Sequence, residues 1–296
     1  MSYFVEREPG VSMDNKYKDI SEIFDNTADS ADIPEKNTMD YFDIINRQLR
    51  EPVTNIFASL PLLADSINSQ NTEKSMETLQ TVYHKTYQML KSVNNISLAA
   101  RLIGKKEFIT EIIDFSSMVQ SVFETSQQVL PDYFSLDLQV ENGCVVQGNS
   151  TLLTSMLFNL LLNSFDYRAE DDVKVCVSLK ASNGRWIFSY KDNSLGIKPE
   201  LSQQVFEPYF SCNPYNDGEV ADKLGLGLYI AKQAILHAKG TMLLQTEFSD
   251  GVKIIASFAE YDGSACAIKS RPKDFMLNKY SAMFVTLCDY CILPDL

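Results

Sequence analysis

Apolar residues recur every three or four positions along residues 39–102, with one polar break at Ser69-Gln-Asn-Thr72. Such spacing predicts two long amphipathic helices, at 39–68 and 73–102, that fold back on each other as an antiparallel hairpin. One hairpin cannot bury its own apolar stripe, whereas two hairpins related by a two-fold axis form a four-helix bundle. We therefore expect a homodimer through this segment. Its repeating apolar positions are Phe42, Ile45, Leu49, Ile56, Leu60, Leu63, Ile67, Met76, Leu79, Tyr83, Leu90, Val93 and Ile96.

A mixed pattern follows the hinge-like break Gly104-Lys-Lys-Glu. Alternating apolar and polar residues predict strands, and longer apolar runs with a period near 3.6 predict helices. We expect an α+β fold overall, in which the helical hairpin precedes an α/β sandwich with helices on one face of a mixed, largely antiparallel sheet. The expected strands are 108–113, 134–140, 144–146, 173–180, 185–191, 241–248 and 252–258, and the expected helices are 116–129, 151–167 and 225–238.

Length and composition bound the organisation of the chain. Its 296 residues, 45% of them hydrophobic, are enough for two domains with real cores. We expect an acidic tail or linker at 1–38, a dimerisation hairpin at 39–103, an α/β domain at 104–262 and a C-terminal extension at 263–296. In that extension, 280–288 is expected as an extra strand, to which we assign no function.

Charge and cysteine usage restrict the partners. The net charge of −13 argues against surfaces that bind nucleic acid or anionic membranes. No apolar run is long enough to span a membrane, and no secretory signal is visible at the N-terminus, so we expect a cytoplasmic protein with reduced cysteines. Only Cys288 and Cys291 form a CxxC pair, and a zinc site would need a second pair or histidines nearby.

Four short stretches between residues 159 and 232 have the chemistry that a nucleotide site requires. Asp192 follows a strand, where a buried carboxylate can accept from an adenine amine, and Gly196 permits a close turn beside the ring. Asn159 and Asn163 lie four apart on one helix face, where their amide oxygens suit Mg²⁺. Gly225 and Gly227 open a helix, whose free N–H groups favour phosphate.

In order and spacing these stretches resemble the four ATP-binding boxes of the histidine-kinase-type ATPase superfamily, which also holds the gyrase-type and Hsp90-type ATPases. The stretches are Asn159-Leu-Leu-Leu-Asn163, Asp192-Asn-Ser-Leu-Gly196-Ile197, Val205-Phe-Glu-Pro-Tyr-Phe210 and Gly225-Leu-Gly227-Leu. The resemblance implies ATP and magnesium as cofactors, with Asn163 as the magnesium ligand, Asp192 at the adenine and a lid at 211–224. The expected nucleotide-binding residues are Asn159, Asn163, Tyr167, Asp192, Gly196, Ile197, Phe206, Gly225, Leu226, Gly227 and Leu228.

Three positions depart from the family pattern. Ser194 stands at the first glycine of Asp-x-Gly-x-Gly, and Lys223 stands where the last box begins with glycine. Asp166 replaces a residue that is basic in many relatives. Lys223 or Arg168 would then have to supply the positive charge that phosphates favour.

The hairpin resembles the dimerisation and phosphotransfer domain of sensor histidine kinases, whose first helix carries His-Glu-Leu-Arg-Thr-Pro. The matching segment here is Arg47-Gln-Leu-Arg-Glu-Pro52, so Arg47 occupies the phosphoacceptor position. A guanidinium stays protonated and cannot attack phosphorus, so no catalytic residue is assigned on this helix. His84 on the second helix is displaced from Arg47 by about 9 residues, or about 13 Å, and we expect it at the surface or the bundle edge.

These residues leave three functions open. The first is a histidine-kinase-like signalling dimer that binds ATP and magnesium and acts as a pseudokinase or scaffold. The second is an active kinase that phosphorylates a residue on a partner protein. The third is a non-enzymatic adaptor dimer with a relic nucleotide site, which the departures at Ser194 and Lys223 favour. A response-regulator-like partner follows from the resemblance alone.

Overall fold

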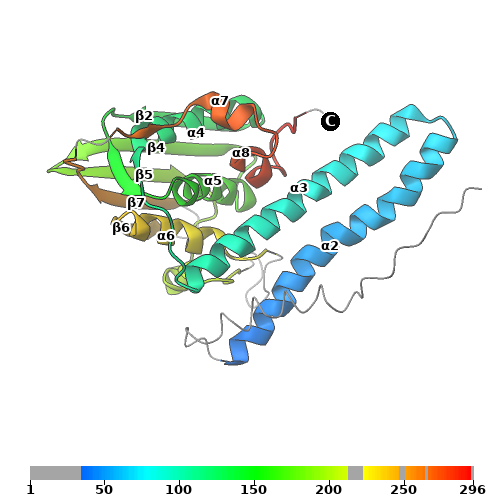
Figure 1. The fold of residues 1–296 in the computed structure, drawn as a ribbon, viewed down its shortest axis with the longest axis horizontal. Coiled ribbons are helices and arrows are strands. Elements are labelled where there is room, and N and C mark those ends of the chain that lie inside the picture. Colours follow the sequence, from blue (N-terminus) through cyan, green and yellow to red (C-terminus); the bar gives the residue numbers. More distant parts are fainter. Residues whose placement is uncertain (1–34, 213–222, 247–250, 264–265, 295–296) are drawn as a thin grey trace, which may run out of the picture.

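The structure is a computed structural model that describes residues 35–212, 223–246, 251–263 and 266–294 (Figure 1). Most of the expected N-terminal tail, and residues 213–222 of the expected lid, lie outside the described residues. Within them, an N-terminal helical hairpin precedes an α/β domain, which confirms the expected fold class. No helix in the described ranges is both long and apolar enough to cross a membrane.

The hairpin consists of α2 (Glu35–Asn68) and α3 (Thr72–Ile103), which run antiparallel and extend beyond the sheet domain (Figure 1). The polar break between them caps the second helix, because the Asn71 side chain accepts a 3.1 Å hydrogen bond from the Lys74 amide. The hydroxyls of Ser66 and Ser75 meet across the turn at 2.9 Å. The helical period of the sequence therefore located both elements to within a few residues.

A five-stranded sheet in the order β2-β4-β5-β7-β6 forms the centre of the second domain. The β2–β4 pair is parallel and the other three pairs are antiparallel. Strands β4 and β5 are joined at Asn183 and Gly184, whose φ angles of 50° and 71° are typical of a two-residue hairpin turn. The strands are β2 (Phe134–Val140), β4 (Val173–Ser182), β5 (Arg185–Asp192), β6 (Thr241–Thr246) and β7 (Val252–Ala259).

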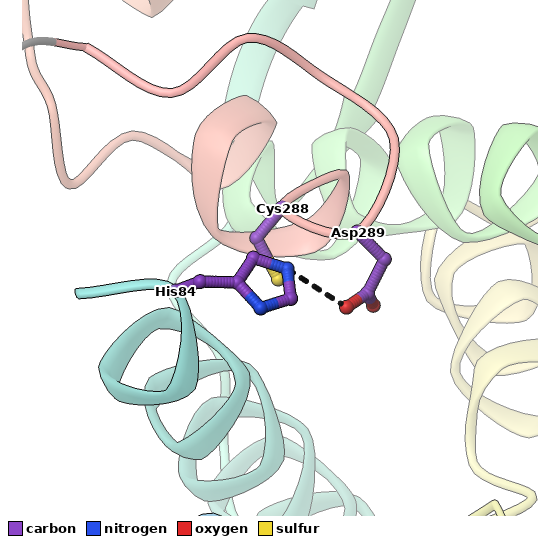
Figure 2. A group of neighbouring side chains, drawn as sticks. All are labelled: His84, Cys288 and Asp289. Atoms are coloured by element: carbon purple, nitrogen blue, oxygen red, sulfur yellow. Dashed lines mark ion pairs between the residues drawn. The ribbon is translucent and has the colours of Figure 1, made fainter. Parts of the chain in front are cut away.

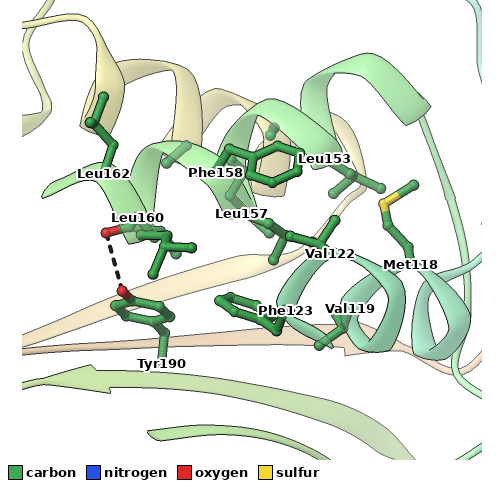
Figure 3. Close-up of a cluster of buried hydrophobic side chains, with 14 of the residues drawn as sticks. Met118, Val119, Val122, Phe123, Leu153, Leu157, Phe158, Leu160, Leu162 and Tyr190 are labelled. Atoms are coloured by element: carbon green, nitrogen blue, oxygen red, sulfur yellow. Dashed lines mark hydrogen bonds between the residues drawn. The ribbon is translucent and has the colours of Figure 1, made fainter. Parts of the chain in front are cut away.

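Three helices cover one face of this sheet: α4 (Phe115–Val129), α5 (Ser150–Asp166) and α6 (Gly227–His237). Along β4 the alternate residues Val173, Val175, Val177 and Leu179 are buried, so only one sheet face carries the core. The core holds the aromatic side chains Phe123, Phe158 and Tyr190 between α4, α5 and the sheet (Figure 3). A smaller sheet, β3-β1-β8, consists of β3 (Val145–Gly148), β1 (Glu111–Asp114) and β8 (Ile268–Lys269).

The C-terminal extension is helical where a strand was expected. Residues 280–288 hold α8 (Ala282–Thr286), preceded by the short helix α7 (Pro272–Met276). The expected strand is wrong because a short apolar run does not distinguish a strand from a buried helix. Helix α8 contacts both α3 and α5, and it lies between the hairpin and the α/β domain (Figure 1).

Candidate functional site

A cavity of about 250 Å³ lies where the end of β5 meets α5 and the start of α6. Eight of the eleven residues expected to bind nucleotide line it, although they come from three separate stretches of the chain. They are Asn163, Tyr167, Asp192, Gly196, Ile197, Gly225, Gly227 and Leu228.

The Asp192 carboxylate is buried, with 5% of its surface exposed, and it is held by four hydrogen bonds. Its Oδ1 accepts from the Ser194 amide at 3.1 Å, the Ser194 hydroxyl at 2.7 Å and the Val252 amide at 2.9 Å. Its Oδ2 accepts from the Ser164 hydroxyl at 2.5 Å. Because a carboxylate oxygen has two lone pairs, Oδ2 keeps one with which to accept from a ligand amine. Ser194, the departure from the usual glycine, thus directs its side chain onto Asp192.

A second layer of hydroxyls supports this carboxylate. The Tyr190 hydroxyl lies 2.6 Å from the Ser164 Oγ and 3.2 Å from the Leu160 carbonyl, the bond drawn in Figure 3. Burial raises the pKa of Tyr190 well above its usual value, so the hydroxyl stays protonated and donates. Since the Ser164 hydrogen is directed to Asp192, the single hydrogen of the Tyr190 hydroxyl is shared between the Ser164 Oγ and the Leu160 carbonyl. The hydrogen-bonded series Tyr190–Ser164–Asp192 fixes the position of the carboxylate.

The glycine-rich turn is shaped by close backbone contacts. Gly225 has a φ of +63°, and a Cβ at this position would lie 2.2 Å from the Phe210 carbonyl oxygen. Only glycine therefore permits the Phe210 backbone to pack on the turn. Helix α6 begins two residues later at Gly227, so its free N–H groups lie at the cavity wall, where they favour an anion.

A second, polar cleft of about 340 Å³ lies between the hairpin and the α/β domain. It shares Asn163, Tyr167, Gly225 and Gly227 with the first cavity, so the two spaces adjoin. The hairpin side of the cleft is lined by Gln48, Glu51, Pro52, Lys85, Gln88, Lys91, Ser92 and Asn95.

Three expected binding residues lie away from the first cavity. Asn159, four residues before Asn163 on α5, lines the polar cleft. Leu226, at the start of α6, also lines the polar cleft. Phe206 is absent from the described lining of either space, and its ring lies 5.3 Å from the Lys232 ammonium. Its neighbour Val205 lines the cavity instead.

The two basic residues expected to face phosphates are both engaged elsewhere. The Lys223 ammonium pairs with the Asp166 carboxylate at 2.8 Å and lies 4.5 Å from the centre of the Tyr167 ring. It still lines the polar cleft. The Arg168 guanidinium lies 5.9 Å from the Tyr133 ring, and it does not contribute to the described lining of either space.

Among the residues that sequence reasoning missed are Ser164 and Lys198. Ser164 is a hydrogen-bond partner of Asp192, and Lys198 lines the cavity. Lys198 lies two positions after the expected site residue Gly196, so its place in the sequence could have identified it as a cavity residue. No sequence pattern pointed to Ser164, because its side chain contacts Asp192 only when α5 packs against β5.

Several known proteins are similar to this chain in sequence. The profile of the family described as histidine kinase-, DNA gyrase B- and HSP90-like ATPase matches residues 148–261. The CAI-1 autoinducer sensor kinase/phosphatase CqsS of Vibrio cholerae is 24% identical over 233 residues, which is 74% of this chain and 33% of that protein. The sensor protein ChvG of Agrobacterium fabrum is 23% identical over 222 residues, 72% of this chain and 36% of that protein. Residues 148–261 therefore match this ATPase family, and the longer similarity is to sensor proteins such as these two.

The fold of the chain is also similar to a solved structure. Full-length ShkA, crystallised in complex with AMPPNP, aligns with a TM-score of 0.51 at 16% identity, covering 79% of this chain and 47% of ShkA. The chain spans about a third of the length of the curated relatives described above.

Proposed function

We propose that this chain is a histidine-kinase-like signalling protein that binds ATP with magnesium but has no phosphoacceptor histidine, and so acts as a pseudokinase or scaffold. The observation that carries the proposal is the junction of the two spaces. A cavity with the Asp192 carboxylate adjoins a cleft whose hairpin wall presents Gln48 and Glu51.

The nucleotide part rests on three groups. The remaining lone pair of Asp192 Oδ2 suits an adenine amine, and the N-terminus of α6 suits phosphate. Asn163 lines both spaces, which is where an amide oxygen would reach a magnesium ion bound to those phosphates. The similarity to ShkA, whose crystals contain AMPPNP, supports the same assignment.

The loss of phosphotransfer to the hairpin rests on where the two histidines lie. His84 and His237 are the only histidines of the chain. Neither belongs to the described lining of the cavity or the cleft. Arg47, at the position that resembles the phosphoacceptor, cannot replace an imidazole as a nucleophile.

The partners follow from the hairpin surface. Phe57, Leu60 and Ile67 are 68%, 46% and 60% exposed, and their spacing places them on one stripe of α2. A second copy of the chain would cover this stripe in a four-helix bundle. A cytoplasmic location and a response-regulator-like partner complete the proposal.

The test is a thermal-shift titration with ATP and Mg²⁺. We expect the wild type to be stabilised, and Asn163→Ala and Asp192→Ala to lose that stabilisation while remaining folded. Asp137→Ala, which removes an exposed carboxylate from β2, is the matched control and should respond as the wild type does. No shift of the wild type at millimolar ATP would contradict nucleotide binding. Incorporation of radiolabel on a histidine of the chain would contradict the pseudokinase assignment.

A further inference from the structure

The fold brings His84 of α3 next to two residues of the C-terminal segment, Cys288 and Asp289 (Figure 2). The imidazole nitrogen, the thiol sulfur and a carboxylate oxygen all lie within 4.8 Å of one another. All six cysteines are free thiols, so the sulfur of Cys288 is available. The histidine that a zinc site requires beside the CxxC pair comes from a position about 200 residues earlier in the sequence.

We propose that His84, Cys288 and Asp289 bind a divalent transition-metal ion of the zinc type. The His84 Nε2 and Asp289 Oδ1 are 3.3 Å apart. Bonds of about 2.0–2.2 Å to nitrogen and oxygen at a tetrahedral angle place such ligand atoms about 3.3–3.5 Å apart. A thiolate, an imidazole and a carboxylate together favour zinc over magnesium or calcium, which take oxygen ligands.

Neighbouring groups orient the carboxylate for this role. Gln88 donates to Asp289 Oδ1 at 2.5 Å, and the Lys91 ammonium pairs with Oδ2. The Oδ1 atom that accepts from Gln88 is also the one 3.3 Å from the His84 Nε2, so it is placed to share an ion with that imidazole. Such outer hydrogen bonds to a ligating carboxylate are typical of metal sites.

The charges at the site sum to +1 once an ion is bound. A thiolate and the Asp289 carboxylate offset the two charges of the ion, and the Lys91 ammonium at Oδ2 remains as one positive charge. Burial raises the pKa of the Cys288 thiol to about 12, so the metal has to displace its proton, as is usual for thiolate ligands. The side chains of His84 and Asp289 remain 35% and 24% exposed, which gives an ion access and leaves water as the fourth ligand.

The position of the site gives it a structural consequence. One ligand belongs to the hairpin and two belong to the C-terminal segment, so a bound ion would fasten that segment onto α3. Asp289 also lines the polar cleft between the hairpin and the α/β domain. The ion would therefore stabilise the arrangement of the two domains around the cleft, whether or not a nucleotide binds there.

The experiment titrates Zn²⁺ into the full chain, freed of metal by a chelator, in competition with a chromogenic chelator. We expect one ion per chain, and binding at least about tenfold weaker in His84→Ala and in Cys288→Ser, as loss of a ligand implies. Co²⁺ in place of Zn²⁺ should give a sulfur-to-metal charge-transfer band that Cys288→Ser removes. Zn²⁺ should also raise the melting temperature of the wild type and not that of His84→Ala.

Cys176→Ser is the matched control, because Cys176 is an exposed cysteine on β4 outside the group. It should bind Zn²⁺ as tightly as the wild type. The proposal is overturned if the wild type binds no stoichiometric ion, or if His84→Ala binds as tightly, since the CxxC pair alone would then account for binding. Circular dichroism of each variant establishes that it is folded.

Discussion

At the scale of single residues, the carboxylate of Asp192 depends on a serine that no nucleotide motif contains. Ser164 donates the only described hydrogen bond to Asp192 Oδ2, and both groups are buried. We expect Ser164→Ala to lower the free energy of unfolding by about 1.5–3 kcal/mol, because a buried charged acceptor loses its donor. Urea denaturation measures this loss.

The control for Ser164→Ala is Ser182→Ala, which changes an exposed serine at the end of β4. We expect that control to remain within about 0.5 kcal/mol of the wild type. Equal effects of the two substitutions would show that the Ser164 bond contributes nothing to stability.

Gly225 and Gly184 illustrate two different reasons why a position in the chain requires glycine. Both have positive φ, at +63° and +71°, but only at Gly225 does a Cβ meet backbone, 2.2 Å from the Phe210 carbonyl oxygen. No described atom lies within 4 Å of a Cβ at Gly184. We expect Gly184→Ala to cost about 1–2 kcal/mol from conformation alone, and Gly225→Ala to cost more and to abolish the ATP-induced thermal shift.

Calorimetry of both alanine variants, with and without ATP, measures these differences. If Gly225→Ala were no more destabilising than Gly184→Ala, the contact with Phe210 would not determine the shape of the turn.

Sequence spacing placed Asn163 and Asp192 in one cavity because each occurs at a fixed position in a recognisable stretch. Phe206, also expected to bind nucleotide, is not part of the described lining of that cavity, because its ring, on the short 3₁₀ helix η2 (Gln204–Phe206), lies toward Lys232. Sequence spacing could not reveal that Asp166 neutralises Lys223, because this ion pair joins residues 57 positions apart.

At the scale of elements, the bounds of helices and strands were predicted best where only one face of the element is buried. Strand β2 was predicted with its observed bounds, Phe134–Val140, because its apolar and polar residues alternate strictly. The run at 280–288 was predicted as a strand and is helical, because its burial comes from α3 and α5 on two sides rather than from a sheet. That environment is not encoded in the local pattern.

The exposed stripe on α2 leads to an expectation about assembly. Ile67 is 60% exposed at the end of α2, so Ile67→Glu should leave the isolated fold intact. If the stripe forms a four-helix bundle, the added charge should weaken the dimer at least tenfold, about 1.4 kcal/mol, by desolvation at the interface. Sedimentation equilibrium measures the dissociation constant.

Leu277→Glu is the control for the dimer, because Leu277 is 82% exposed in the C-terminal segment. We expect it to dimerise as the wild type does. A wild type that sediments as a monomer, or an Ile67→Glu variant with unchanged affinity, would exclude assembly through this stripe.

At the scale of the whole molecule, the C-terminal segment joins the hairpin to the α/β domain. The Tyr87 hydroxyl of α3 donates to the Lys279 carbonyl at 2.6 Å, and the Tyr290 hydroxyl donates to Asp166 of α5 at 2.8 Å. Burial raises the pKa of both tyrosines, so both hydroxyls are protonated donors. Sequence reasoning could not foresee this, because both contacts are between residues more than 100 positions apart.

These two bonds should be energetically coupled if the segment acts as one clamp. We expect Tyr87→Phe and Tyr290→Phe each to cost about 0.5–1.5 kcal/mol of unfolding free energy. The double variant should lose less than the sum by at least about 0.5 kcal/mol, because a segment released at one end gains little from its bond at the other. Tyr87→Phe combined with Ser164→Ala, which share no partner, provides the additive reference. If the tyrosine pair were as additive as this reference, the two contacts would be independent, and the segment would not transmit a change at the hairpin to the wall of the nucleotide site.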